Sequence, residues 1–459
     1  MHHRSFLMHW FFGFLERRLQ RANVRFVAVA VLIVSMLLLS LTVATAVSGR
    51  TIFGPSLGAD YAAFYTAGTI LNEFPAERLY DLELQNRLYH SLFPQVPANQ
   101  ILPYANPPFL AAGFRLVALL PYAWSFLLWL ALSASLYVGG LLLLCMCVRR
   151  MPPPDKRLAL LLALSFEPFI MECWLGGQLS ALGFFCIVLA LRLDQRGRSF
   201  LSGAALAGCL YKPTLLPLLL AMMVFSRRWR TAVGFAVGGF CLAVVSLVVA
   251  GPHGCEDYTK LMLSYAGAAT GTESVFRVWK FVDLNSFFKM ASGGSAPVAR
   301  VLACACGLIA SPWLLRAWWA MDAGRAERRG LVWTGTAAAT VVLNVYVGIY
   351  DSILVVPALL VVYDAVYQDE KLDRVFRLFL VLVYVTPWFS QALARAVGLQ
   401  VYTLVLLAAA AWPFWIGRRS VAVAAPRGKG ACLPGDTQPA VARGACPSAS
   451  AGALSHSAG

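Results

Sequence analysis

The feature that most constrains this chain is the recurrence of apolar runs close to 20 residues long. About 20 apolar residues allow a helix to cross a bilayer. Hydrophobic residues make up 59% of the sequence and charged residues only 13%; soluble domains are nearer half and a quarter. The short alternating segments of a membrane barrel are absent. We therefore predict an all-α polytopic membrane protein with about 10–12 membrane helices, including half-length helices.

The net charge of +16 comes from Lys and Arg clustered beside the apolar runs. Residues 1–25 alone hold five arginines. The other clusters lie at 149–157, 192–198, 227–230, 316–329, 371–377 and 418–429. Such clusters mark cytoplasmic loops, so the charge orients the chain in a membrane with both termini in the cytoplasm. We see no basic stripe for nucleic acid.

The charge pattern divides the chain into three regions. Residues 1–25 are predicted to form an amphipathic helix on the cytoplasmic leaflet. Residues 26–417 form the transmembrane domain, and residues 418–459, rich in Ala, Gly, Ser and Pro, are expected to be a disordered cytoplasmic tail. Within the membrane domain, 48–106 and 252–297 are the expected extracytoplasmic loops.

Short helices are expected inside the first extracytoplasmic loop. The pattern predicts helices over 61–73 and 76–93, separated by Pro75. Glu73, Glu77, Asp81 and Glu83 lie on or just before the second helix, and we interpret them as its solvated face.

The apolar run over 201–226 is interrupted by Lys212-Pro213. Basic loops flank both of its ends, yet 26 residues cannot cross the membrane twice. Two half-length helices meeting at Lys212 would resolve this conflict. Irregular backbone at membrane depth is tolerated where it lines a cavity or is buried in protein. Lys212 is therefore a candidate site residue, with a structural or snorkelling lysine as the alternative.

Metal chemistry is not expected from the residues. Most of the eleven cysteines lie inside apolar runs, where free Cys behaves as a small hydrophobe. No CxxC pair occurs, and three of the six histidines lie in the first nine residues. We predict no metal site and no cofactor.

An ordered set of short segments carries a family resemblance. In chain order the segments are "GADYAAFYTAG", "YANPPF", "LPYAWSFLLWLALS", "GGQLSALGF", "LAGCLYKPTLLPLLL" and "YDSILVVPALL". Their order and spacing over residues 26–415 resemble glycosyltransferase family 87, also called DUF2029. The resemblance implies a GT-C helical bundle whose first outer loop carries the catalytic acid, here Asp60. It also implies a mannosyltransferase-like, inverting enzyme of the bacterial plasma membrane that uses a polyprenyl-phosphate sugar on the outer face.

The sequence supports two hypotheses for the role of Asp60. As the matching acid of the first outer loop it would be the base that deprotonates an acceptor hydroxyl. Because Asp is also favoured at helix N-caps and helix-like residues follow it, capping is the alternative. The expected partners are membrane lipids, a lipid-linked sugar donor and a glycolipid or glycan acceptor.

Six residues are candidates for substrate binding. Lys212 is the first candidate to hold phosphate, and Lys280 is a weaker candidate in the second outer loop, together with Arg277 and Lys289. Gln178 would hydrogen-bond sugar hydroxyls unless "WLGGQ" is a plain Gly-rich turn, and Asp351 is a site residue or a helix N-cap. Tyr61 and Tyr65, with Phe64 between them, would stack on a sugar or prenyl chain unless they belong to an interface belt.

Two other functional classes remain open from the sequence. Broken helices and intramembrane charge, including Glu167 beside Pro168, also suit a transporter or lipid flippase. A non-catalytic assembly factor would not need Asp60. The late outer turn has no His, and its polar residues are Asn344, Tyr350 and Asp351.

Overall fold

A computed structural model describes residues 20–46, 58–97, 102–270, 277–321 and 326–424. Within these ranges the chain forms helices and no strand, which confirms the predicted all-α fold. Seven of the described helical segments are long and apolar enough to span a membrane, and one bent pair adds an eighth. The seven are Arg21–Thr45, Tyr122–Cys145, Trp229–Ser264, Ala296–Trp319, Ile349–Val366, Glu370–Val397 and Val401–Arg419. The chain is thus a multi-pass membrane protein.

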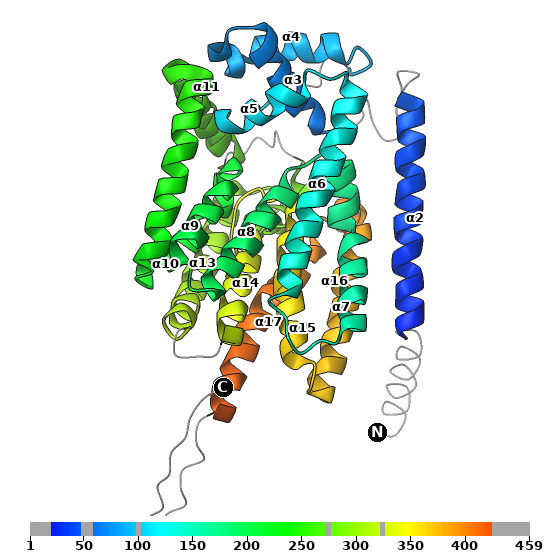
Figure 1. The fold of residues 1–459 in the computed structure, drawn as a ribbon, viewed down its shortest axis with the longest axis vertical. Helices are drawn as coiled ribbons and strands as arrows, with labels where there is room; N and C mark the ends of the chain where they lie inside the picture. The colour runs from blue at the N-terminus through cyan, green and yellow to red at the C-terminus, as the bar shows by residue number, and fades with distance from the viewer. Residues whose placement is uncertain (1–19, 47–57, 98–101, 271–276, 322–325, 425–459) are drawn as a thin grey trace, which may run out of the picture.

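Short helices form a layer at one end of the bundle (Figure 1). They are α3 (Tyr61–Glu73), η1 (Ala76–Tyr80), α4 (Leu82–Leu92) and α5 (Pro108–Val117). The remaining elements are α2 (Arg21–Ala46), α6 (Tyr122–Cys145), α7 (Pro153–Leu164), η2 (Pro168–Leu175), α8 (Ser180–Gln195), α9 (Ser199–Ala207), η3 (Gly208–Tyr211), η4 (Pro213–Leu215), α10 (Pro217–Phe225), α11 (Trp229–Thr270), η5 (Val278–Lys280), α12 (Leu284–Ala291), α13 (Ala296–Trp319), α14 (Ala326–Val342), η6 (Ile349–Val355), α15 (Val356–Val366), α16 (Glu370–Val397) and α17 (Val401–Ala424).

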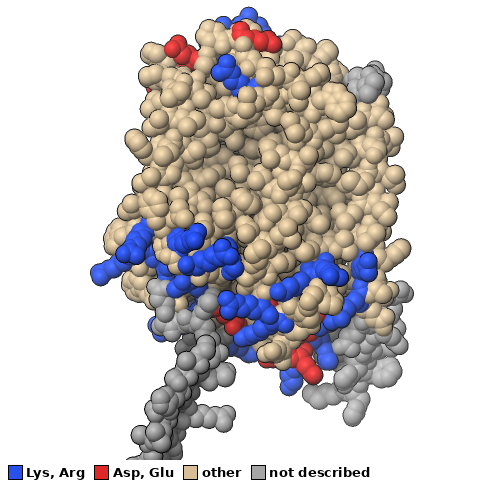
Figure 2. All heavy atoms as spheres, viewed as in Figure 1, with Lys and Arg blue, Asp and Glu red and all other residues tan. Residues whose placement is uncertain are grey.

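The charged residues separate along the long axis of the molecule. Figure 2 shows Lys and Arg gathered at the end where α2 begins and α17 ends, below a broad uncharged band. An uncharged band is the surface that lipid tails require, because an exposed charge there is costly. The layer of short helices lies at the opposite end, beyond the band (Figures 1 and 2).

The apolar run over 201–226 is broken near its middle, as the sequence predicts. α9 and η3 end at Tyr211, and η4 and α10 begin again at Pro213. Lys212 lies between the two halves with φ −136° and ψ 81°, outside helical backbone. A β-carbon added at Gly203 would overlap the backbone oxygen of Thr231, so α9 packs closely on α11. Small residues permit such close approach of membrane helices.

The segment predicted as the first outer loop contains the expected helices in part. The helix expected over 61–73 is α3, but the segment over 76–93 divides at Asp81 into η1 and α4. Asp81 causes the division because its side chain accepts hydrogen bonds from the backbone N–H groups of Glu83 and Leu84 and so caps α4. Glu73, Glu77 and Glu83 are exposed, as predicted.

The segment predicted as the second outer loop begins with helix. The sequence places its start at residue 252, and α11 continues from a bend there to Thr270. Gly251, with φ 66° and ψ 177°, bends the helix, and Pro252 then opens its second segment. Proline is tolerated there because the first turn of a helix needs no backbone donor from it. The predicted regions 1–25 and 418–459 lie mostly outside the described residues.

Candidate active site

Asp60 lies at the start of α3 but does not cap it. The residue occupies the N-cap position with φ −73° and ψ −18°, and its side chain accepts no hydrogen bond from the first turn. Instead, the side-chain amide of Gln178 donates to Oδ2 of Asp60. The capping alternative is therefore not realised, and the carboxylate is held against the segment that follows η2.

The turn before α3 docks closely on the turn that carries Gln178. The backbone N–H of Asp60 donates to the carbonyl of Gly176 at 3.2 Å. Gly177 has φ +75°, and a β-carbon there would lie 2.6 Å from Cβ of Tyr61 and 2.8 Å from the Gly58 carbonyl oxygen. Only glycine fits both the conformation and the space. The Gly-rich turn is thus what brings Gln178 to Asp60.

A second carboxylate comes from the π-helical segment η2. Glu172 of this segment accepts a hydrogen bond of 2.5 Å from the side-chain amide of Gln391 on α16. Glu172 is also close enough to Asp60 and Lys280 to interact electrostatically with both. π-Helical turns inside helical proteins are rare and occur frequently at functional sites.

Lys212 and Asp351 form an ion pair beside this group. Asp351 is fully buried, with Oδ2 paired to Nζ of Lys212 and Oδ1 accepting from Oγ of Ser180 at 2.6 Å. Nζ of Lys212 lies 4.9 Å from the ring centre of Tyr350. Asp351 is inside η6 rather than at its N-cap, Gly348, so it does not act as that cap. Lys212 is also close enough to Asp60 to interact electrostatically with its carboxylate.

Lys280 is positioned by contacts between the segment that precedes α12 and the turn that precedes η6. Val282 donates its N–H to the Val347 carbonyl, and Asp283 accepts from the Val347 N–H, both at 2.9 Å. The Gln400 amide donates to the Trp279 carbonyl at 2.8 Å. Lys280 is exposed and, among the residues described, forms no ion pair. It is close enough to Asp60 to interact electrostatically with its carboxylate.

Opposing influences set the proton affinity of Asp60. Burial raises the pKa of its carboxyl above the ordinary value of 3.8. The charge of Lys280, the hydrogen bond from Gln178 and the charge of Lys212 lower the pKa, but burial outweighs them. A raised pKa makes the ionised carboxylate a stronger proton acceptor than an ordinary aspartate.

Tyr61 and Tyr65 are not part of this polar group. Tyr61 is fully buried, and its hydroxyl shares a hydrogen bond of 2.5 Å with Ser125 of α6. The Tyr65 hydroxyl donates to the Leu120 carbonyl at 3.0 Å. The Tyr61 ring centre lies 5.4 Å from that of Phe126, within a buried aromatic cluster. The structure gives both rings a packing role, and their contact with a sugar or prenyl chain stays a prediction.

The weaker candidates fall in different environments. Arg277 is exposed, whereas Lys289 is buried and its Nζ contacts the Tyr346 hydroxyl at 3.2 Å. Glu167 is buried at the bend between α7 and η2, and its Oε2 has no hydrogen-bond partner among the described residues.

Sequence reasoning missed Glu172, Gln391 and Ser180. An available signal was Glu172 itself, an acid between Met171 and Cys173 in an apolar run, because intramembrane acids are functional candidates by default. No local pattern points to Gln391, which reaches Glu172 from 219 residues away in the sequence. Among the described residues, no three His, Cys, Asp or Glu side chains gather in a metal-binding group.

Comparison with known proteins identifies one family. The model of Glycosyltransferase family 87 matches residues 104–345, more than half of the chain. Gln178, Lys212 and Lys280 fall inside the match, whereas Asp60 and Asp351 fall outside it. No curated protein and no solved structure matches the chain.

Proposed function

Because the chain belongs to glycosyltransferase family 87 and is therefore a membrane glycosyltransferase, we propose a specific reaction for it. It transfers a sugar, with mannose as the first candidate, from a polyprenyl-phosphate donor to a hydroxyl of a lipid or envelope glycan. The reaction takes place on the outer face of a bacterial plasma membrane, with both termini in the cytoplasm. The basic end of the molecule supports this orientation, since basic residues favour the cytoplasmic side.

A single displacement accounts for the proposed chemistry. Asp60 accepts the proton of the acceptor hydroxyl while the oxygen of that hydroxyl bonds to the anomeric carbon of the sugar. The bond from that carbon to the phosphate oxygen breaks, and polyprenyl phosphate leaves with the electron pair. One displacement inverts the anomeric configuration. The donor is already activated by its phosphate, so the proposal invokes no metal or cofactor.

The observation that carries this proposal is the environment of the Asp60 carboxylate. It does not cap α3, Gln178 orients it, and burial raises its pKa. These are properties that a general base needs. Lys280, exposed nearby, is the first candidate to bind the donor phosphate, because Lys212 is already paired with Asp351. Glu172 and Gln178 are the candidates to hydrogen-bond sugar hydroxyls.

The test compares lipid-linked and envelope glycans by mass spectrometry in cells that lack the protein. Wild type should restore the missing species, and Asp60→Asn should not, because removing a general base slows turnover by roughly 10²–10⁴-fold. Asp81→Asn is the matched control, since Asp81 caps α4 in the same loop and Asn also caps. Restoration of every species by Asp60→Asn would exclude Asp60 as the base.

A further inference from the structure

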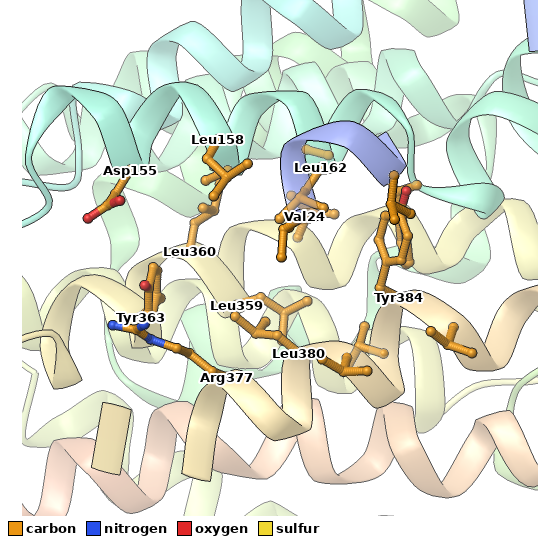
Figure 3. Close-up of a pocket in the computed structure, with 18 of the residues that line it drawn as sticks. Val24, Asp155, Leu158, Leu162, Leu359, Leu360, Tyr363, Arg377, Leu380 and Tyr384 are labelled. Atoms are coloured by element: carbon orange, nitrogen blue, oxygen red, sulfur yellow. The ribbon is translucent and has the colours of Figure 1, made fainter. Parts of the chain in front are cut away.

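A cavity of about 370 Å³ lies between α2 and the rest of the bundle. Its walls come from α2, α7, α15 and α16. Figure 3 shows Asp155, Tyr363 and Arg377 at one end, leucine side chains along its length, and Tyr384 at the other end. The cavity shares no lining residue with the Asp60 group.

The cavity fits within the depth of one membrane leaflet. Along α7 its lining extends from Asp155 to Ala163. At 1.5 Å per residue this is about 12 Å, which is less than half of the ~30 Å hydrocarbon core. Arg21, the first residue of α2, lines the charged end. That end therefore lies with the basic end of the molecule.

The charged end offers donors to an anion. Arg21 contacts Asp155 through Nε and Nη2, both at 2.9 Å, and its side chain is 65% exposed. Arg377 contacts Asp373 through Nη2 at 2.5 Å, and its side chain is 50% exposed. Because a guanidinium carries five N–H donors, each arginine keeps donors beyond those that its carboxylate partner uses. A guanidinium group can bind a phosphate through two parallel N–H···O hydrogen bonds, which favours arginine at phosphate sites.

Lipid can reach the cavity beside α2. This helix packs mainly against α7 and η2 and lies at the edge of the bundle (Figure 1). Apolar side chains beside the cavity, such as Phe26, are exposed. An unfilled apolar cavity would forfeit dispersion contacts along its walls. A lipid chain would restore these contacts and join α2 to the bundle.

We propose that this cavity binds one anionic phospholipid of the cytoplasmic leaflet. One acyl chain fills the space between α2, α7 and α16, and the phosphate binds Arg21 and Arg377. The site is separate from the glycosyltransferase site, so its occupancy requires neither donor nor turnover.

Lipid retention measured by native mass spectrometry tests the proposal. The full-length protein is purified in mild detergent and titrated with dioleoyl phosphatidylglycerol or dioleoyl phosphatidylethanolamine. Wild type should retain one phosphatidylglycerol in preference to phosphatidylethanolamine. Leu162→Trp, which fills the cavity, should retain it about tenfold less, and Arg377→Gln should reduce the preference by a similar factor.

Two substitutions outside the cavity are matched controls. Leu37→Trp on an exposed face of α2 and Arg25→Gln, exposed on the same helix, should retain lipid as wild type does. If Leu162→Trp fails to elute as a folded protein, Ala159→Leu fills the same cavity with an aliphatic side chain in place of an aromatic one. The proposal is overturned if wild type retains no lipid or does not discriminate between the two headgroups. Retention by the folded filled variants equal to that of wild type would overturn it as well.

Discussion

Asp60 occupies a helix N-cap position, but its side chain binds a residue that is distant in the sequence. The sequence around it fits a helix N-cap, and the backbone takes that position. The carboxylate nevertheless binds Gln178, which comes from another part of the fold. A cap would leave the carboxylate satisfied by backbone N–H groups, which favour its ionised form and lower its basicity. Because Asp60 does not cap α3, its carboxyl keeps the raised pKa that burial produces.

The raised pKa of Asp60 predicts the pH dependence of turnover. A general base is active when ionised, so activity should fall as the pH drops through its pKa, above the range of an ordinary aspartate. Lys280 lowers the pKa of Asp60, so Lys280→Met should raise that pKa further and move the acid limb of kcat/KM to higher pH. Lys260→Met, at an exposed lysine paired with Glu256, should leave the limb in place. An acid limb that stays put or moves to lower pH in Lys280→Met would contradict this assignment.

At the scale of elements, the site depends on breaks in helices. η2 is π-helical, Lys212 interrupts the α9–α10 run, and Gly177 turns the chain between η2 and α8. Each break releases backbone from regular hydrogen bonding and places a polar side chain where a continuous helix would not. Buried partners then hold these side chains, as Asp351 holds Lys212. Removing one member of such a buried pair would leave the other charge uncompensated.

The Gly177 turn provides a test at this scale. Gly177→Ala places a β-carbon against Tyr61 and the Gly58 carbonyl and forces a non-glycine residue to a positive φ. We expect a loss of about 1–3 kcal/mol in stability from the backbone alone. We also expect a larger loss of turnover, because the turn would move Gln178 away from Asp60. Thermal unfolding in detergent and a transfer assay measure the two effects.

Gly197→Ala is the matched control for that test. Gly197 has φ +74°, nearly the same as Gly177, but a β-carbon there meets nothing within 4 Å. Its substitution should cost only backbone strain and leave turnover intact. Equal turnover in the two alanine variants would show that close docking of the two turns is unnecessary.

For the whole molecule, charge placement predicts the orientation in the membrane. Lys and Arg gather at one end, whereas α3 and its neighbours lie at the other (Figures 1 and 2). Moving a cluster of basic residues across a bilayer is unfavourable, so the basic end should remain in the cytoplasm. With that orientation, we expect the Asp60 site to face outward and the proposed phospholipid site to open to the inner leaflet.

Cysteine labelling checks this orientation. A cysteine replacing Glu256, exposed in the outer segment of α11, should react with a membrane-impermeant maleimide in intact cells. A cysteine replacing Arg196, exposed in the basic turn after α8, should react only after permeabilisation. Wild type gives the background from native cysteines. The reverse labelling pattern would place the candidate site in the cytoplasm.

The sequence by itself determined the membrane class, the short helix after residue 60 and the break at Lys212. These features follow from run length, charge placement and local propensity, which are properties of neighbouring residues. Only the tertiary structure decided that Gln178, 118 residues away, donates a hydrogen bond to the Asp60 carboxylate. It also decided that Glu172 lies close enough to Asp60 to interact with it electrostatically. It also decided that Tyr61 packs in the core. Such pairings depend on which helices meet, and similar apolar runs do not encode that choice locally.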